Sequence, residues 1–585
     1  MVIFSVLIFG TMFYYQYITK DKQAAEKSKT EQISKTTTTP VNNTAAPVTT
    51  NTTTPTATPA ATEKVSIKND LLTLEVSSLG GQLSSVRINT YNAYDKEKKD
   101  KPLYLFSNHN SSYGFQFKDK SGKVFNTKDL IFTPQVSGNT VTMQTNLGDA
   151  SIQFIYTLLP QYTVDFKVRT VGLSQVIGEH KADFVWDYQV REAEKGRAQE
   201  QSHTEFVYAF DNYNGYDYDA RSDMDESKET LNWLGVKQQF FSAVIESKSG
   251  FTQSKGSQET IEKGEFLKKF NYNGQVALSG SELNQDFTWY FMPLELPLLK
   301  SYNKNFEEIL PLGWSFIRGL NTWFFIPVYE FIANWGLAAG WAIFLLTIIV
   351  KIILSPIMFK QHKLSAMMKV IRPEVDAVNE KFKKADPMKK QQAVLEVYRK
   401  AGVNQLAGCI PALLQIPIFY ALFRFFPNYI DFRGKSFWFA EDLSSYDDVI
   451  KLPFNVPLIG EHISIFALAC TVVILIYTVM TSGNMQQPQQ EGMPNMKILM
   501  YIFPITFLFF LNTSSSGLSW YYLVSNALNI VIILIIKHFI IDEDKIHAQI
   551  QENKAKPVKE GRFQKKMREM MEQAQEQQKQ QARKK

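Results

Sequence analysis

The sequence has few of the residues from which catalytic and metal sites are usually built. Its 585 residues include two cysteines, Cys409 and Cys470, and seven histidines. The cysteines lie in apolar runs without the spacing of a disulfide framework or of zinc ligands. The histidines form no HExxH motif, and no GxxxxGK phosphate-binding loop occurs. These absences disfavour a hydrolase or an ATPase, and we predict no enzymatic activity, metal site or cofactor.

Two segments at the N-terminus are predicted to lie outside any packed domain. Residues 1–19 contain the apolar run Val2–Ile18, which no small-residue cleavage site follows, so we predict an uncleaved membrane anchor. The lack of a basic residue before Val2 suggests that the native start lies upstream. Residues 20–62 are rich in Thr, Pro, Ala and Asn without apolar periodicity, which predicts a disordered linker.

Residues 63–300 carry the period-two pattern of half-buried strands. The runs LTLEV, IQFIYTL, YTVDFKV and ADFVWDYQV each place apolar side chains on one face of a strand. Glycines at positions 80, 81, 172 and 250 interrupt such runs and are predicted to form turns. We therefore predict a large antiparallel β-sandwich. Its aromatic residues fit either the core or a carbohydrate-binding groove.

Residues 301–334 are amphipathic and rich in aromatic side chains. Trp314, Phe316, Trp323 and Tyr329 belong to the residue types that settle at a lipid headgroup boundary. This predicts a linker followed by a helix that lies in the outer membrane interface. A packed connector beneath the sandwich is the alternative interpretation.

The apolar run at 335–359 is the element around which the second half is organised. It is long enough to cross a bilayer core of roughly 30 Å at about 1.5 Å per helical residue. It holds one charge, and Thr347, Lys351 and Ser355 recur every four residues, so they form one polar stripe on a helix. A charge within a span faces protein or water rather than lipid. Lys351 therefore either snorkels to the nearer interface or lies in a polar cavity inside the helix bundle.

Charged and apolar segments alternate through the rest of the chain. Residues 360–405 hold eleven basic and five acidic residues, a net charge of +6, and Pro387 is expected to separate two helices of a hairpin. The loop 428–462 has a net charge of −3, and the chain after Ile536 has +5. This alternation places the hairpin and tail in the cytoplasm and the sandwich outside. The predicted spans are 1–19, 335–359, 406–427, 463–481, 497–512 and 517–537, with a cytoplasmic loop at 482–496 and a basic cytoplasmic tail at 538–585.

Polar residues also occur inside the later spans. They are Gln415, Thr506, Ser519, Ser525, Asn526 and Asn529. Each by itself fits a hydrogen bond between helices. Together with Thr347 and Lys351 they predict a shared wet cavity that is open to the cytoplasm. Such a groove would let a polar segment enter the inner leaflet without full dehydration.

Four runs in this half carry a specific resemblance to a known family. TIIVKIILSPI, NQLAGCIPALLQIPIFYALFRFF, MPNMKILMYIFPITFLFF and SSGLSWYYLVSNALNI are similar to the insertase core of the YidC/Oxa/Alb family. The order of segments resembles Gram-negative members. The resemblance implies a polytopic α-helical membrane protein of the cell inner membrane, with six spans, a five-helix insertase core, a large periplasmic antiparallel β-sandwich and a cytoplasmic C-terminus. It covers nearly the whole chain and is tightest from 334 to 540.

The resemblance assigns residues to a hydrophilic groove. Lys351 corresponds to the family's intramembrane basic residue, usually Arg, and it differs because a buried lysine can lose its proton. Thr347 matches the family's functional threonine, the pair Tyr521 and Tyr522 matches the tyrosines of the last span, and Gln415 lies in the matching QxPIF motif. The predicted substrate-binding groove comprises Lys351, Thr347, Ser355, Gln415, Tyr521, Tyr522, Ser525 and Asn526.

The implied activity is that of a membrane protein insertase and chaperone that works alone or with the Sec translocon. An acidic or polar N-terminal stretch of a client would be drawn toward Lys351, and its apolar helix would leave between the third and fifth spans. The implied partners are nascent membrane-protein clients, the Sec translocon, membrane lipids and the ribosome, which would bind the hairpin and the basic tail through RNA phosphates. Binding of the tail to the membrane surface is an alternative.

Two other functions stay open at this stage. A secondary transporter or channel would require a continuous pore with paired ionisable groups, and Lys351 has no evident acidic partner in any predicted span. A periplasmic sugar-binding or sugar-modifying module would bind saccharide through the sandwich.

Overall fold

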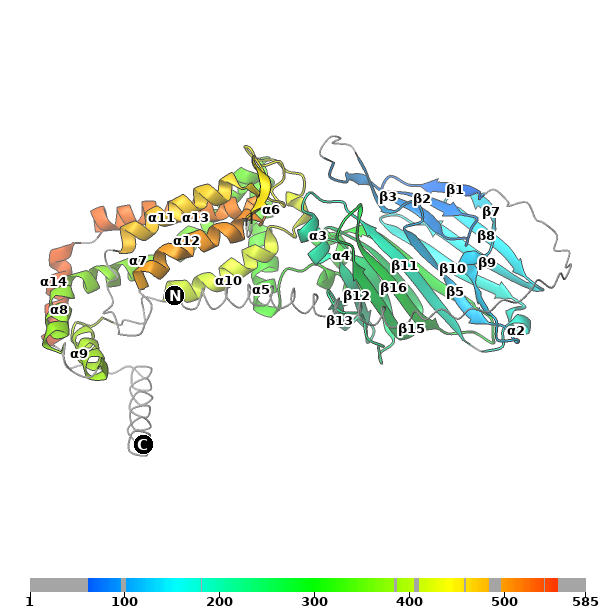
Figure 1. Cartoon of the computed structure of the whole chain (residues 1–585), viewed down its shortest axis with the longest axis horizontal. Coiled ribbons are helices and arrows are strands. Elements are labelled where there is room, and N and C mark those ends of the chain that lie inside the picture. Colours follow the sequence, from blue (N-terminus) through cyan, green and yellow to red (C-terminus); the bar gives the residue numbers. More distant parts are fainter. Residues whose placement is uncertain are drawn as a thin grey trace, which may run out of the picture.

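The computed structural model describes residues 62–95, 101–179, 181–382, 387–403, 410–456, 459–482, 496–540 and 542–555. Figure 1 shows a β-rich part built from the first half of the chain and, at one end of it, a bundle of helices built from the second half. The predicted anchor at 1–19, almost all of the linker at 20–62 and the tail beyond residue 555 lie outside the described residues.

The β-rich part contains two antiparallel sheets that pack against each other. Among the described residues, the smaller sheet has four strands in the order β1-β2-β3-β4, and the larger has thirteen. The path of the larger sheet runs β6-β5-β11-β16-β15-β17-β10-β9-β8-β7, and β14, β12 and β13 continue from β15 as a branch. The strands are β1 Lys64–Lys68, β2 Leu72–Ser77, β3 Leu83–Asn92, β4 Pro102–Phe106, β5 Ser111–Lys118, β6 Val124–Asn126, β7 Thr133–Ser137, β8 Thr140–Leu147, β9 Ala150–Leu158, β10 Thr163–Val171, β11 Ala182–Arg191, β12 Glu205–Phe210, β13 Gly215–Asp219, β14 Leu231–Lys237, β15 Phe241–Thr260, β16 Phe266–Val276 and β17 Gln285–Pro293. Among the described residues three short helices interrupt them, the 3-10 turn η1 Thr127–Asp129, α2 Leu173–Val176 and α3 Arg197–His203.

The inward faces of the strands follow the period-two pattern of the sequence. In β11 every second residue is buried, and the buried set is Ala182, Phe184, Trp186, Tyr188 and Val190, each at most 2% exposed. These rings meet Phe106 of the smaller sheet and Trp289 of β17, so the two sheets share one aromatic core. The aromatic residues of these strands thus form the core, and the groove interpretation of these side chains is wrong.

One predicted turn is also wrong. Gly250 lies inside β15, a strand of twenty residues that ends at Thr260. Its φ of +80° marks an irregularity in the strand, and the register of β15 against β14 shifts beside it. A Cβ atom at this position would lie 2.3 Å from the side chain of Thr230. Glycine is therefore required here by a bulged strand rather than by a chain reversal.

A connector of short helices joins the sheets to the bundle. Its elements are α4 Leu296–Ser301, η2 Phe306–Ile309, α5 Ser315–Leu320, the π-helical turn η3 Asn321–Phe325 and α6 Ile326–Ala333. Phe325 and Tyr329 are each 1% exposed, whereas Trp323 is 85% exposed and Trp314 66%. One face of the connector is therefore packed and the other presents aromatic side chains, while its position in the outer membrane interface stays a prediction.

The helical part contains the remaining long elements. They are α7 Ala339–Val370, α8 Arg372–Lys381, α9 Pro387–Lys400, α10 Ile410–Phe425, α11 Ile465–Ser482, α12 Met496–Asn512, α13 Ser516–Ile535, the π-helical turn η6 Ile536–Ile540 and α14 Glu543–Ala555. The loop between α10 and α11 carries η5 Ile430–Phe432 and the hairpin of β18 Ile450–Val456 and β19 Gly460–Ile463. In the described part of the chain, two helices are long and apolar enough to span a membrane, Ala339–Val370 and Ser516–Phe539, and the apolar helices at Leu414–Phe425, Ile465–Thr481 and Met500–Asn512 are shorter.

The first helix of the bundle is longer than the predicted span 335–359. It continues through Pro356 to Val370, and α8 starts after a break at Ile371. The predicted first arm of the hairpin is therefore divided between the end of α7 and α8. The described part of the second arm is α9, Pro387–Lys400.

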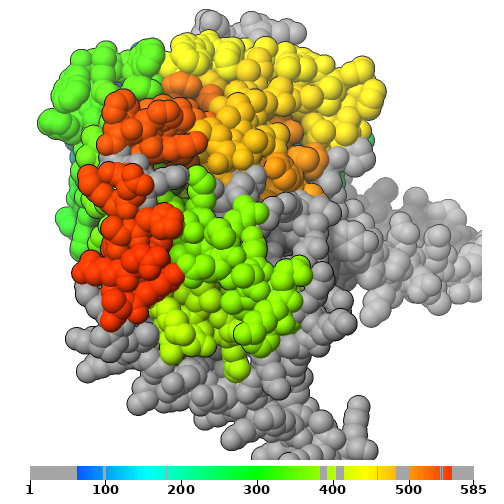
Figure 2. Space-filling model, turned by 90° about the vertical axis from the view of Figure 1, so that its left-hand side faces the viewer, coloured from blue at the N-terminus to red at the C-terminus, as the bar shows by residue number. Residues whose placement is uncertain are grey.

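The C-terminal helix α14 packs against the base of this hairpin. Figure 2 shows its red surface beside the yellow-green surface of the hairpin. A small apolar cluster, separate from the main core, joins Met367, Ile371, Ala401, Val403, Ile546 and Ile550. Lys554 pairs with Glu374 at 2.5 Å, and the Asn553 amide donates to the Ala401 carbonyl at 3.2 Å. The helix thus contacts both the entry and the exit of the hairpin.

Candidate functional site

The polar stripe of α7 is graded in burial along the helix. Thr347 is fully buried, Lys351 is 6% exposed and Ser355 is half-buried. The Thr347 hydroxyl donates to the Ile343 carbonyl at 2.7 Å, and the Ser355 hydroxyl donates to Ile352 at 2.8 Å. Both hydroxyls are thus satisfied by their own helix, and Lys351 is the member of the stripe that reaches another helix.

Lys351 reaches α13. Its Nζ donates a hydrogen bond of 2.8 Å to Oδ1 of Asn529. Lys351 lies twelve residues after the start of α7 and nineteen before its end, so the ammonium is held inside the bundle rather than at a helix end. Among the described residues no carboxylate lies within ion-pair distance of it. The positive charge is therefore solvated by an uncharged amide and not neutralised.

The two tyrosines of α13 line a different part of the bundle. Tyr521 is 1% exposed and Tyr522 is 5% exposed. The Tyr522 ring lies 5.5 Å from Phe419 of α10 and 5.5 Å from Phe507 of α12. Its hydroxyl has no hydrogen-bond partner in the described part of the chain. Tyr522 thus brings an unpaired polar group to the aromatic contact between α10 and α12.

Tyr521 turns toward the end of α10. Its ring lies 6.0 Å from Phe426 and meets Tyr522 edge-on at 5.4 Å. Ser525 is 3% exposed, and the half-buried Asn526 donates to the Tyr522 carbonyl at 2.8 Å. These residues therefore extend the polar surface of α13 from the tyrosines toward the C-terminal end of the helix.

Gln415 lies half-buried on α10 and makes no hydrogen bond to Lys351 in the described residues. The structure thus brings Lys351 to α13, but it does not join Gln415 to that pair. The partner that it does reveal is Asn529, which the sequence presents only as one of several polar residues in the last span. The spacing of Tyr522, Asn526 and Asn529 places all three on one helical face, and this is the only signal for Asn529 in the sequence, but it does not distinguish Asn529 from Asn526.

Comparisons with known proteins match both parts of the chain. A family model described as YidC periplasmic domain matches residues 64–326, and one described as 60Kd inner membrane protein matches residues 328–544. The membrane protein insertase YidC of Parabacteroides distasonis is 37% identical over 528 residues, which cover 86% of this chain and 82% of the relative. The protein of that name from Bacteroides fragilis is 34% identical over 511 residues, with 84% and 81% covered. The chain belongs to the YidC family of membrane protein insertases.

A solved structure of an active YidC insertase with its first transmembrane domain resolved is also similar. It is 18% identical, covers 82% of this chain and 94% of its own, and aligns with a TM-score of 0.33. As a YidC-family insertase, the chain is an inner-membrane protein with a periplasmic β domain, and it is not an enzyme. Its clients are nascent membrane proteins.

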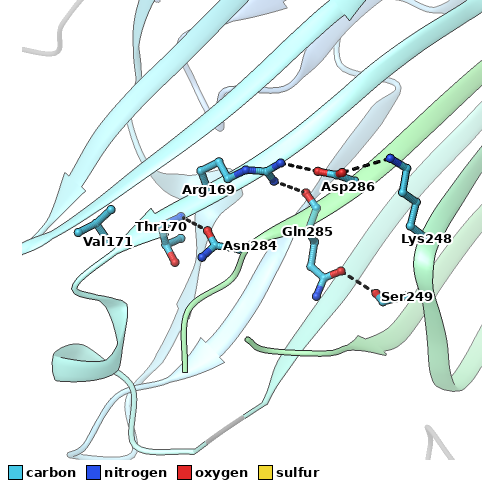
Figure 3. A pocket seen from close by; sticks show the side chains of 8 residues that line it. All are labelled: Arg169, Thr170, Val171, Lys248, Ser249, Asn284, Gln285 and Asp286. Carbon is cyan, nitrogen blue, oxygen red and sulfur yellow. Dashed lines mark hydrogen bonds and ion pairs between the residues drawn. The ribbon is translucent and has the colours of Figure 1, made fainter. Parts of the chain in front are cut away.

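The periplasmic domain of this YidC-family chain carries a polar hollow of about 660 Å³ between β10, β15 and β17. Figure 3 shows its lining, which is Arg169, Thr170, Val171, Lys248, Ser249, Asn284, Gln285 and Asp286. Asp286 pairs with Arg169 at 2.5 Å and with Lys248 at 3.2 Å. The lining contains no aromatic residue, and its charges are paired with one another. This described hollow thus lacks the aromatic platform that a saccharide site commonly uses.

Proposed function

We propose that this insertase moves client segments through a hydrophilic groove that is open to the cytoplasm. Its lining would be Lys351, Thr347, Ser355, Gln415, Tyr521, Tyr522, Ser525 and Asn526, with Asn529 as the acceptor for Lys351. The observation that carries the proposal is the hydrogen bond between Lys351 and Asn529, because it leaves a positive charge inside an apolar bundle with no counter-charge among the described residues.

In this mechanism an acidic or polar stretch of the client is attracted to the Lys351 ammonium. In the low-dielectric bundle such an attraction is stronger than in water. A carboxylate of the client can take the place of the Asn529 amide, since an ionised acceptor binds an ammonium more strongly than a neutral one. The polar stretch is thereby held while the following apolar helix meets lipid. No covalent bond is made or broken.

The apolar helix of the client leaves between α10 and α12. Tyr522 supports this route, because its ring contacts both helices and its hydroxyl lacks a partner in the described structure. On this side the Phe419 ring contacts the rings of Phe507 and Phe510, which also contact each other. A client helix can therefore replace these contacts with others of similar chemistry.

The proposed arrangement in the membrane has six spans, with the periplasmic domain outside and the C-terminus in the cytoplasm. The +6 charge of residues 360–405 supports this orientation. The hairpin and the basic tail are proposed to bind the ribosome, and the insertase is proposed to work alone or beside the Sec translocon.

A photo-crosslinking experiment tests the groove. A photoreactive phenylalanine analogue replaces Phe419, so that Lys351 stays intact, and a single-span client is stalled on ribosomes. We expect adducts with client residues in or just before the apolar segment, and fewer adducts when Lys351→Glu is added. The same analogue at Leu468, which is 40% exposed on α11, is the matched lipid-facing control. Equal adducts at both positions would refute the exit route.

A further inference from the structure

The loop between α10 and α11 is held from two sides. The cap is defined here as residues 428–456 and 459–463. It lies at the end of the bundle that meets the periplasmic domain, where Figure 1 shows α3, α4 and α6. Within it, the stretch 441–448 contacts the first residues of two bundle helices and also a lysine of the periplasmic domain.

On the bundle side the cap completes the start of α13. The N–H of Ser516 donates to the Ser445 carbonyl at 2.7 Å, and the N–H of Gly517 donates to the Leu443 carbonyl at 2.9 Å. The first N–H groups of a helix have no partner within the helix. The cap therefore supplies acceptors that fix where α13 begins.

The cap also completes the start of α11. Asp447, which is 1% exposed, accepts hydrogen bonds from the Ser464 hydroxyl at 2.5 Å and from the Ile465 N–H at 2.7 Å. A carboxylate at a helix start satisfies free N–H groups and interacts favourably with the helix dipole. Cap residues thus bind two helix starts within a few positions of one another.

On the opposite side a lysine of the periplasmic domain holds the same stretch. Lys195 follows β11, and its side chain is 4% exposed. Its Nζ donates to Asp448 at 2.7 Å and lies 3.4 Å from Glu441. It also lies 5.6 Å from the centre of the Tyr446 ring. The lysine therefore binds the cap through two carboxylates and an aromatic face.

A second link is made by an arginine of the cap. The Arg433 Nε donates to both carboxylate oxygens of Glu194 at 2.8 and 2.9 Å, and its Nη2 donates to the Asn92 carbonyl at 2.7 Å. Its guanidinium lies 5.0 Å from the centre of the Phe241 ring. The side chains of Arg433 and Glu194 are 10% and 6% exposed. The pair is thus largely withdrawn from solvent and fixed in direction.

The contacts to the two sides alternate along the sequence. Leu443, Ser445 and Asp447 bind helix starts, whereas Tyr446 and Asp448 bind Lys195. Because neighbouring residues of one short stretch bind both sides, the stretch cannot leave Lys195 without shifting the acceptors of α13. The two parts of the molecule are therefore mechanically joined at this point.

We propose that Lys195 and Arg433 are positioning residues for insertion. They act through the cap to hold the start of α13, the helix that carries Tyr522 and Asn529. The functional part of this inference rests on the proposed groove. It gives the periplasmic domain a role in holding the groove residues of α13 at a fixed position relative to Lys351 on α7.

The test uses the full chain in lipid nanodiscs. Lys195→Met and Arg433→Met remove the charge and keep an unbranched apolar side chain, whereas Lys195→Arg and Arg433→Lys retain the charge. Lys118→Met is the matched control, because Lys118 makes an exposed pair with Glu179 at 3.2 Å elsewhere on the domain. Hydrogen exchange is followed in the peptides that contain Ser516 and Gly517, and client insertion is measured in proteoliposomes of the same variants.

We expect the two Met variants to increase exchange at Ser516 and Gly517 by about fivefold, as expected for local opening. Insertion should fall in parallel, and the charge-retaining variants should recover most of both signals. Exchange within β11 and β16 should stay unchanged, which verifies that the domain is folded.

Unchanged exchange at Ser516 and Gly517 would overturn the proposal. Faster exchange with normal insertion would also overturn it, because the cap would then hold the helix without positioning the groove. Neither outcome bears on the groove itself, which the crosslinks from position 419 in the unaltered protein test separately.

Discussion

Lys351 on α7 donates a 2.8 Å hydrogen bond to Asn529 on α13, 178 positions later in the sequence. The acceptor is uncharged, so the ammonium is held in place, and in the proposed mechanism its positive charge remains available to a client. A carboxylate in the place of Asn529 would fix the lysine more firmly but would cancel the attraction. An amide at this position thus fits the proposed site, which would bind and release acidic segments.

The sign of the charge at position 351 should decide insertion. We expect Lys351→Arg to keep activity and Lys351→Glu to reduce it by about tenfold, equivalent to about 1.4 kcal/mol. Only the second change reverses the attraction for an acidic client segment. Complementation of an insertase-depleted strain and insertion of a radiolabelled client measure the difference. Equal activity of the two variants would contradict the electrostatic mechanism.

Asn529 provides a separate test of charge against structure. Asn529→Leu removes the acceptor of Lys351. It should lower the free energy of unfolding by about 2 kcal/mol, which is the scale of a lost hydrogen bond to a charged group. Asn529→Asp should preserve stability yet reduce insertion of clients with acidic N-terminal segments, because the new carboxylate neutralises Lys351. Thr478→Val is the control, since its hydroxyl donates only to its own helix at Ile474. Normal insertion by Asn529→Asp would argue against the proposed attraction.

Close packing between α7 and the cap should make Gly340 intolerant of a side chain. A Cβ atom there would lie 2.1 Å from the Phe437 ring. We expect Gly340→Ala to destabilise the protein by about 1–3 kcal/mol, as overpacking does. Adding Phe437→Leu should restore part of the loss. Gly319→Ala is the control, because no atom lies within 4 Å of its Cβ position. Thermal unfolding in detergent measures all four proteins, and equal melting of the two single variants would contradict this packing.

The contact between α14 and the hairpin base should depend on Ile550. This side chain is 1% exposed in the small cluster with Ile371 and Val403. We expect Ile550→Ala to cost about 2 kcal/mol of local stability through a lost apolar contact and a cavity. Hydrogen exchange of peptides around residues 367–371 and 398–403 should increase, whereas the exposed Gln551→Ala should leave it unchanged. No change in either peptide would show that α14 does not brace the hairpin.

The stability of the periplasmic domain should rise on the alkaline side of neutrality. Burial lowers the pKa of Lys268 from the usual 10.5 to about 8. The unfolded chain therefore binds more protons than the folded one between these two values, and unfolding becomes harder as pH rises through this window. We expect a gain of about 2 kcal/mol between pH 7.5 and 9.5 from this group. Guanidinium unfolding followed by circular dichroism measures the free energy of unfolding at each pH. In Lys268→Met this free energy should no longer rise between pH 7.5 and 9.5. An equal rise of the free energy of unfolding with pH in the unaltered protein and in Lys268→Met would refute this prediction.

The strands could be predicted because the alternation of residues within a short stretch of sequence indicates which face of each strand is buried. Phe184, Trp186 and Tyr188 stand at every second position of β11, and the structure buries all three. Gly250 could not be assigned in this way, because a turn and a bulge require glycine for the same reason, a positive φ. Only the pairing of β15 with β14 and β16 distinguishes them.

In the candidate site, too, some relations could be predicted from the sequence and others depend on tertiary packing. Helical spacing alone places Thr347, Lys351 and Ser355 on one stripe, since local geometry fixes that relation. The choice of Asn529 as the partner depends on how α13 packs against α7, and several polar residues of the last span were equally suitable candidates. The link of Lys195 to the cap and the link of the cap residue Arg433 to Glu194 have no counterpart in any local pattern.

The sequence by itself therefore determined the alternation of β-rich and apolar regions, the face of each strand and the presence of a charge within an apolar helix, because these depend on residues a few positions apart. The tertiary structure alone decided which amide receives the Lys351 ammonium, that α14 closes the hairpin base and that the cap joins the periplasmic domain to α13. Those relations depend on side chains that are far apart in the sequence, and only packing selects one partner among several of similar chemistry.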